Sequence, residues 1–318
     1  MLHIRVFSFA AAMAAGAFLA AGQDVHVVVA QDGTGDFPTV QNALDHALDK
    51  APIGGRGRLY IEIRPGTYRE RVVVPQDMPR VTLVGKDAAT TIITHGQTAK
   101  ETGGTFFSAT VDVDGAGFEA QNITFENPAQ GAQAVAVSVH SDRAIFRDYR
   151  FIGWQDTLYA ASGRQYYVHC YISGHVDFIF GNAAAVFEDC EIHSRGNGYL
   201  TAVRRTRADE PTGFVLIGSR LTADEGVTSV ALGRPWRLYA RVVYIDCWMG
   251  PQIVPGGWNN WNKPEAEKTA FYGEYHSTGP GARLEARVAW SHQLTATEAA
   301  AFRPEVFLRG NDGWNPAK

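Results

Sequence analysis

The sequence has no large charge excess and only one long apolar run, and each of these shortages excludes a class of protein. Lys and Arg number 29 against 33 Asp and Glu, so the formal net charge is −4. This balance offers no basic surface for nucleic acid, and an anionic polymer would need local cationic contacts. The apolar run, Val6–Leu19, is too short to span a membrane. We therefore expect no nucleic-acid partner and no membrane anchor.

The apolar run has the features of a secretory signal peptide instead. His3 and Arg5 form a weakly basic start, and the small residues Ala20 and Gly22 occupy positions −3 and −1 of a cleavage site. The sequence predicts a leader at residues 1–22 and one mature domain at 23–318. The mature protein is expected to be secreted, either to a periplasm or outside the cell, and to be a monomer.

Common catalytic signatures are missing as well. The sequence has neither a Gly-x-Ser-x-Gly elbow nor a His-Glu-x-x-His helix, and its ten histidines lack metal-ligand spacing. Gly33-Thr34-Gly35 lacks the rest of a dinucleotide fingerprint. His169 and His175 fall near the acidic residues described below, where a structural role is the more common one. We expect no metal and no cofactor, which leaves the carboxylates as candidate catalysts.

Short strand-like segments recur along most of the chain. The pattern apolar-x-apolar-x-(Asn, Asp or Cys)-x-x-apolar occurs at Phe118–Phe125, Ala144–Phe151 and, less completely, Tyr166–Ser173, with looser copies at Val186–Ile192, Phe214–Leu221 and Val242–Met249. Steps of roughly 20 to 30 residues are typical of a solenoid, in which stacked coils share one core. A β-sandwich is the alternative, but its regular Asn-Gly or Asp-Gly turns are scarce.

Two segments depart from the strand pattern. Helical spacing of apolar residues predicts short helices at Thr39–Lys50 and Leu294–Phe302, near the two ends of the mature chain. The stretch Gly256–Lys263 is expected to be a long aromatic loop. The fold class is therefore all-β, a single-stranded parallel β-helix with short N- and C-terminal helices.

Two aspartates lie 21 residues apart, each in a segment of aromatic and β-branched neighbours. Asp156 and Asp177 would cost several kcal/mol if buried without a partner or a function. Residues one coil apart in a parallel β-helix are separated by about 4.8 Å, so the two carboxylates would be neighbours. By the same reasoning Cys170 and Cys190, 20 residues apart, would fall within disulfide range. The pair Asp156 and Asp177 could be a nucleophile and a general acid, or a structural pair that shares a proton.

Other side chains near the dyad favour catalysis. Gln155 precedes Asp156, and Gln133 falls one coil earlier; amide N–H groups at these places suit an oxyanion hole. Arg234 could orient and ionise an aspartate through a charge-assisted contact. Three aromatic residues offer flat apolar faces of the kind that pack on sugar rings: Tyr159, Phe180 and Trp236.

These residues and their order resemble the pectin methylesterases, carbohydrate esterase family 8. The resemblance covers nearly all of the mature chain. It rests on Gly66–Glu70, the Gln133 segment, Gln155–Tyr159, Val176–Gly181 and Leu232–Trp236, with later matches at Tyr272–Tyr275 and Gly279–Ala282. It differs at His175, where threonine is common, and at Ala132, where histidine often precedes the glutamine.

The resemblance implies a right-handed parallel β-helix and a role for each site residue. Asp177 resembles the nucleophile, Asp156 the general acid and base, and Arg234 the partner of the nucleophile. Gln133 and Gln155 resemble the groups that stabilise the tetrahedral intermediate. The expected substrate contacts are Thr105, Gln133, Tyr159, Val176, Phe180, Arg234 and Trp236. The pair Cys170 and Cys190 resembles a disulfide found in some bacterial members.

The expected activity is hydrolysis of the methyl esters of pectin to pectate and methanol, with pectin as the partner. Two alternatives remain open from the sequence. A β-helical glycosidase or lyase would cut the polymer backbone and create new reducing ends. A catalytically silent carbohydrate-binding protein on the same scaffold would bind the polymer without turnover.

Overall fold

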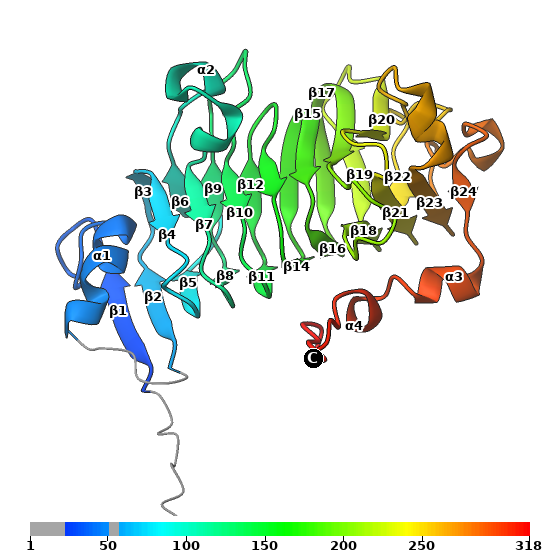
Figure 1. Ribbon diagram of the computed structural model, residues 1–318. Helices are drawn as coiled ribbons and strands as arrows, with labels where there is room; N and C mark the ends of the chain where they lie inside the picture. The colour runs from blue at the N-terminus through cyan, green and yellow to red at the C-terminus, as the bar shows by residue number, and fades with distance from the viewer. Residues whose placement is uncertain (1–22, 51–56) are drawn as a thin grey trace, which may run out of the picture.

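Successive coils of the chain stack along one axis, and each coil contributes strands to two long sheets (Figure 1). The computed structural model describes residues 23–50 and 57–318; the leader predicted at 1–22 lies outside the described residues. Strand pairing between coils is parallel in both sheets of the described chain. The architecture is the right-handed parallel β-helix that the sequence predicted, and the β-sandwich alternative is wrong.

The two sheets differ in how many strands they take from each coil. The first takes one: β1 (Val25–Val29), β2 (Leu59–Ile63), β5 (Val81–Gly85), β8 (Glu119–Gln121), β11 (Ala144–Arg147), β14 (Arg164–Val168), β16 (Ala184–Glu188), β18 (Gly213–Ile217), β21 (Arg241–Ile245), β23 (Phe271–Tyr275) and β24 (His292–Gln293). The second takes two strands from most coils and has two parallel rows. One row contains β3 (Gly66–Arg69), β6 (Thr91–Thr94), β9 (Thr124–Glu126), β12 (Arg150–Ile152), β19 (Arg220–Ala223) and β22 (Trp248–Met249). The other contains β4 (Val72–Val74), β7 (Val111–Val113), β10 (Val137–Val139), β13 (Leu158–Ala160) and β20 (Val230–Pro235). Two long strands, β15 (Tyr171–Gly181) and β17 (Glu191–Val203), run through both rows.

Helices are short and lie at the edges of this stack. The predicted N-terminal helix is α1 (Val40–Lys50), which packs against β1 at the first coil, and Thr39 Oγ1 accepts a hydrogen bond from Asn42 N. The predicted C-terminal helix is shorter than expected, α3 (Ala296–Ala300), and begins with a Thr295–Glu298 capping box. The sequence analysis missed the short helices α2 (Ala99–Thr102), α4 (Pro304–Phe307), η1 (Thr105–Phe107), η2 (Pro264–Lys268) and η3 (Leu284–Ala286).

The core is built from side chains that repeat from coil to coil. Phe146 pairs with Tyr167, and Tyr167 with Phe187, in the register of the first sheet. Their rings stack at centroid distances of 5.0 and 4.6 Å, and all three are fully buried. Because in-register strands align like residues, each coil buries its apolar face only against its neighbours.

A left-handed corner explains the recurring polar residue of the sequence pattern. The link from a strand of the first sheet to the next strand of the second begins with a residue of positive φ; these residues are Asn122, Asp148, His169, Asp189, Gly218 and Asp246. Asn, Asp and His tolerate this conformation better than other side chains. In the third copy of the pattern, Tyr166–Ser173, the pattern places Cys170 at the corner, but the corner residue is His169. The strand register explains the difference: Gln165 pairs with Ala144, so His169 is equivalent to the corner residue Asp148.

Cys170 and Cys190, for which the resemblance implies a disulfide, are both free thiols in the structure. The two residues do occupy equivalent positions on neighbouring coils, and Cys170 N lies 3.4 Å from Cys190 Sγ. Each buried thiol donates instead to a backbone carbonyl two residues earlier, Val168 O at 3.5 Å and Glu188 O at 3.3 Å. Stacking therefore makes the cysteines neighbours, while each S–H group has a hydrogen-bond acceptor of its own.

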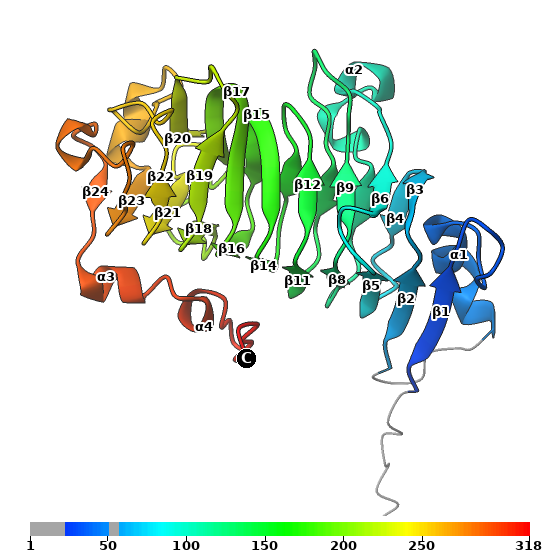
Figure 2. The same ribbon diagram turned by 180° about the vertical axis from the view of Figure 1, so that it is seen from behind.

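The C-terminal segment folds back along the outer face of the first sheet, as Figure 2 shows for α3 and α4. Leu294, Phe302 and Leu308 pack into one apolar cluster with outward side chains of β14, β16, β18 and β21. Arg164 fixes the end of this segment, because its guanidinium binds both Asp142 and Asp312. The C-terminal segment therefore covers part of the outer face of the first sheet. No helix in the described part of the chain is long and apolar enough to cross a membrane.

Candidate active site

Asp156 and Asp177 lie side by side on adjacent coils, as their spacing predicted. Gln155 pairs with Val176, and Leu158 pairs with Ile179, so the two aspartates fall opposite each other in the parallel register. Asp156 occupies the link between β12 and β13, whereas Asp177 lies within β15. Both side chains are nearly buried, with relative exposures of 9% and 6%.

Both aspartates have a left-handed backbone conformation, with φ of 64° at Asp156 and 51° at Asp177. A register shift between Val176 and Ile179 marks a bulge at Asp177, where β15 pairs with β17. Positive φ at a non-glycine residue costs of order 1–3 kcal/mol, and away from turns and corners it clusters at functional sites. The bulge interrupts the regular alternation of side chains, so an acidic group can face a surface hollow and not the core.

The environment of Asp156 favours its protonated form. Its pKa rises from 3.8 to about 8, chiefly because of burial and also because of the nearby charge of Asp177, whereas Arg234 acts in the opposite direction. The carboxyl group therefore carries a proton at neutral pH. A protonated carboxyl beside a second carboxylate is the arrangement that a general acid requires.

Asp177 has a dedicated cationic partner. Arg234 Nε and Nη2 donate to Asp177 Oδ1 and Oδ2 at 2.8 and 2.7 Å, which is a bidentate ion pair. Burial raises the pKa of Asp177, while this guanidinium and the more distant Lys263 oppose the rise. The ion pair keeps the carboxylate charged and fixes its orientation. The two aspartates thus have different surroundings although they are neighbours, since Asp177 alone is ion-paired with Arg234.

The two glutamines lie on the same ladder as the dyad. Gln133 pairs with Gln155, which in turn pairs with Val176, so the three residues occupy equivalent positions on three successive coils. Both glutamines border a cavity of about 250 Å³ together with the two aspartates and Arg234. Amide N–H groups that border the same cavity as Asp177 suit the stabilisation of an oxyanion.

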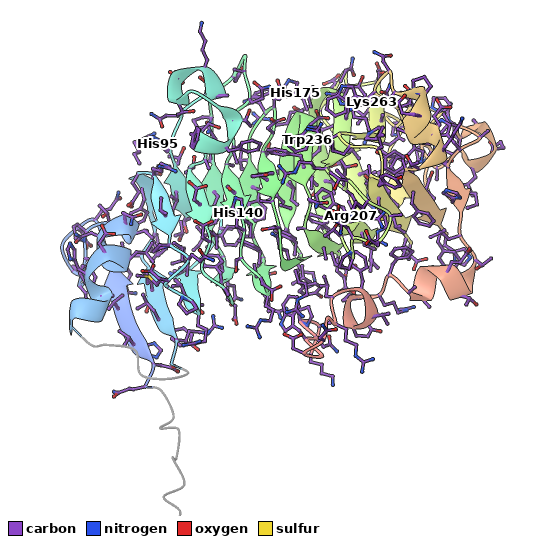
Figure 3. The ribbon with its side chains drawn as sticks, in the orientation of Figure 1. His95, His140, His175, Arg207, Trp236 and Lys263 are labelled. Atoms are coloured by element: carbon purple, nitrogen blue, oxygen red, sulfur yellow. The ribbon has the colours of Figure 1, made fainter. Side chains whose placement is uncertain are left out.

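Aromatic rings form one wall of the cavity. Tyr159 is buried between Phe106 and Phe180, with ring centroids 4.8 and 4.7 Å away, and Phe180 lies 6.1 Å from Trp236. Figure 3 shows Trp236 on the same side of the molecule as Lys263, whose Nζ donates to the carbonyls of Pro235 and Trp236 at 2.9 and 3.0 Å. Flat faces next to a polar floor suit a sugar ring.

The structure brings together most of the predicted substrate contacts. Thr105, Gln133, Phe180, Arg234 and Trp236 border the cavity directly. Tyr159 does not border it, but the Tyr159 ring packs against Phe106 and Phe180, which do. Val176 is separate from this group: it borders a neighbouring hollow with Tyr199 and Asn259.

Sequence reasoning missed several residues that border the cavity. These are Phe106, Ala202 and Trp261. Phe106 directly follows the predicted contact Thr105, and Trp261 lies in the predicted aromatic loop, so both had a signal. No spacing rule connects that loop to the dyad. His169 and His175 do not border the cavity, and His169 pairs with Asp148 at the exposed corner.

The described residues contain no group of three or more His, Cys, Asp or Glu side chains that could hold a metal ion. The chemistry of the cavity is that of two carboxyl groups, a guanidinium and two amides. Such a set can attack an acyl carbon, stabilise an oxyanion and protonate a leaving group.

Comparison with known proteins agrees with this chemistry. The family model described as Pectinesterase matches residues 26–311. The chain is 41% identical over 294 residues to Pectinesterase 31 of Arabidopsis thaliana, a match that covers 89% of this chain and 92% of that protein. It is also similar to the solved pectin methylesterase from carrot, with a TM-score of 0.85, 40% identity and coverage of 90% and 93% of the two chains. A pectin methylesterase solved in complex with hexasaccharide VII has a TM-score of 0.76 and 28% identity, over 92% of this chain and 98% of that one. The chain therefore belongs to the pectinesterase family, whose members are carboxylic ester hydrolases.

Proposed function

We propose that Asp177 is the nucleophile with which this pectinesterase removes methyl groups from pectin. The observation that carries the proposal is the split of the dyad: Asp177 is held by the bidentate Arg234 ion pair, and Asp156 keeps its proton because burial raises its pKa to about 8. One carboxylate can attack while the other donates a proton.

The first half of the reaction forms an acyl-enzyme. A carboxylate oxygen of Asp177 attacks the C6 carbonyl carbon of a methylated galacturonate, and the carbonyl electrons move onto its oxygen. The amides of Gln133 and Gln155 donate to that oxyanion. As the tetrahedral intermediate collapses, the bond to the methoxy oxygen breaks, Asp156 protonates this oxygen and methanol leaves. The product is an anhydride between the sugar C6 and Asp177.

The second half restores the enzyme. Asp156, now a carboxylate, takes a proton from water as that water attacks the C6 carbonyl carbon. The bond to Asp177 breaks, and Asp177 returns to its ion pair with Arg234. The sugar leaves as a carboxylic acid, and Asp156 is protonated as at the start. Each turnover consumes one water and one ester and yields one methanol and one acid.

The aromatic wall supports pectin as the substrate. Phe106, Phe180 and Trp236 offer apolar faces beside a cavity that is open to solvent, so a polymer can lie across it. The complex of a relative with hexasaccharide VII supports an extended site. We further propose that the chain is secreted as a monomer after loss of residues 1–22, and that it acts in the modification or degradation of plant cell walls.

Methanol release from highly methylated pectin tests the assignment. Asp177→Asn should lower the rate at least about 1,000-fold in a sample that thermal melting shows to be folded. Asp148→Asn is the matched control, because Asp148 has the same left-handed conformation on an exposed corner. Full activity in Asp177→Asn would refute the nucleophile. New reducing ends without methanol would refute the esterase in favour of a backbone-cleaving enzyme.

A further inference from the structure

The Arg234 guanidinium lies between two aromatic rings. Its Cζ atom is 3.8 Å from the ring centroid of Tyr199 and 3.7 Å from that of Trp261. Two rings this close to one planar group must cover its opposite faces. One edge of the same guanidinium donates to both oxygens of Asp177. The cation is thus fixed on both faces and along one edge, and it remains only 16% exposed.

Tyr199 comes from the strand that separates the nucleophile from the arginine. In β17 it pairs on one side with Val176, which precedes Asp177, and on the other with Ala231 of β20. Its position therefore depends on the two strands that it connects. Its backbone lies between the strand that carries Asp177 and the strand that carries Arg234.

Trp261 comes from a loop that holds an unfavourable backbone. Trp261 and Asn262 have consecutive φ values of 54° and 53°, a conformation that side chains with a Cβ rarely adopt. Asn259 Oδ1 accepts from Trp261 N at 2.7 Å, and Asn260 Oδ1 accepts from Asn262 N at 2.9 Å. These two bonds hold the loop in its strained form.

The same loop is attached directly to the strand that carries the arginine. Asn259 N donates to Gly233 O at 3.1 Å, next to Arg234 in the chain. Lys263 Nζ donates to the carbonyls of Pro235 and Trp236, on the other side of Arg234. The loop is therefore hydrogen-bonded to the backbone on both sides of Arg234, and the Trp261 ring lies over the Arg234 guanidinium.

We propose that Tyr199 and Trp261 are positioning residues that clamp Arg234 and thereby keep Asp177 ionised and correctly oriented. This inference rests on the proposed function, in which Asp177 is the nucleophile. Planar stacking suits the guanidinium because it is weakly hydrated, and it restricts a side chain that otherwise has many rotamers. A contact with substrate alone would not require either ring to lie on the arginine.

The clamp has a consequence for pH dependence. The charged or titratable groups around Asp177 are Asp156, Arg234, Lys263 and the buried Tyr272. Burial raises the pKa of Asp177, and the alignment of Arg234 opposes this rise. An unclamped arginine would oppose it less, so Asp177 would take up a proton at a higher pH. The acidic limb of the activity profile would then move upward.

Paired substitutions distinguish a clamp from a substrate contact. Trp261→Leu and Tyr199→Leu remove an aromatic face, whereas Trp261→Phe and Tyr199→Phe keep one. We expect each Leu variant to lower kcat about tenfold and to move the acidic limb of kcat/KM up by about 0.5 to 1 pH unit. The Phe variants should recover most of both effects. Trp248→Leu is the control, because Trp248 stacks on Arg220 at 4.3 Å away from the cavity, and it should change neither.

Methanol release across the acidic pH range gives all of these values, with thermal melting to select folded variants. If the Leu variants raise KM while kcat and the acidic limb stay unchanged, the rings contact substrate and the clamp is refuted. Equal losses in the Phe and Leu variants would also refute it. Asp177→Asn in the same assay separates the two proposals: if that variant is active, the proposed nucleophile fails whatever the ring variants do.

Discussion

Asp156→Asn should abolish activity and yet stabilise the protein near neutral pH. In the unfolded chain this carboxyl ionises near its ordinary pKa of 3.8, whereas in the fold it keeps its proton to about 8. Below both values the two states bind the same number of protons, and no penalty exists. Between them the folded state holds one more proton, so the free energy of unfolding falls by ~1.4 kcal/mol per pH unit. Asparagine carries no charge and removes this loss.

The size of the effect follows from that interval. At pH 7 the accumulated penalty for Asp156 is about 4 kcal/mol, which corresponds to roughly 6 °C in melting temperature for a chain of this length. At pH 4 the penalty is close to zero. The melting temperature of Asp156→Asn should therefore exceed that of the unchanged protein increasingly from pH 4 to pH 8.

Thermal unfolding at several pH values between 4 and 8 measures this difference. Asp148→Asn serves as the control, because its carboxyl is half exposed and it shares the left-handed backbone of Asp156. Its melting temperature should follow that of the unchanged protein. A difference for Asp156→Asn that stays constant across the pH range would refute the raised pKa. A lower melting temperature at pH 7 would show that the protonated carboxyl makes a stabilising contact that asparagine cannot replace.

Three further predictions concern the scaffold. Arg287→Met should lower stability by about 3–5 kcal/mol in chemical denaturation, since it leaves the fully buried Glu274 without its ion-pair partner; a change below 1 kcal/mol would contradict this. Gly181→Ala should lower the melting temperature by several degrees, because a Cβ there would lie 2.0 Å from a carbonyl oxygen and φ is 130°; an unchanged value would show that the coil can shift. Arg164→Met should release the C-terminal segment held through Asp312 and increase its proteolysis, with methanol release retained; equal protease resistance would show that apolar packing alone holds it.

The aligned parts of the site could be predicted from sequence spacing. Asp156 and Asp177 are 21 residues apart, and the register between Gln155 and Val176 has the same step. In a parallel stack a constant step along the chain becomes a neighbour in space, so a one-dimensional pattern is sufficient. The same argument placed Gln133 on the ladder and brought Cys170 close to Cys190. It did not determine whether the two sulfurs were bonded, because proximity does not decide which acceptor each thiol uses.

Contacts between unaligned segments could not be predicted in this way. Trp261 reaches Arg234 from a loop outside the repeat, and its orientation depends on Asn259 and Asn260 accepting local hydrogen bonds. Short sequence patterns do not encode such contacts, because they arise only once both segments are folded. The left-handed conformation of Asp177 also escaped prediction, since it depends on a bulge relative to β17.

The left-handed corner fixes which side chains of the following strand face the core. From β8 to β22, each link between a first-sheet strand and the following second-sheet strand holds two residues, while the other connections vary in length. Deleting one residue from such a link would exchange inward and outward side chains in the strand that follows. Insertions elsewhere would only enlarge a loop. Chain length can therefore vary in loops that carry no site residue, and hardly at all at the corner.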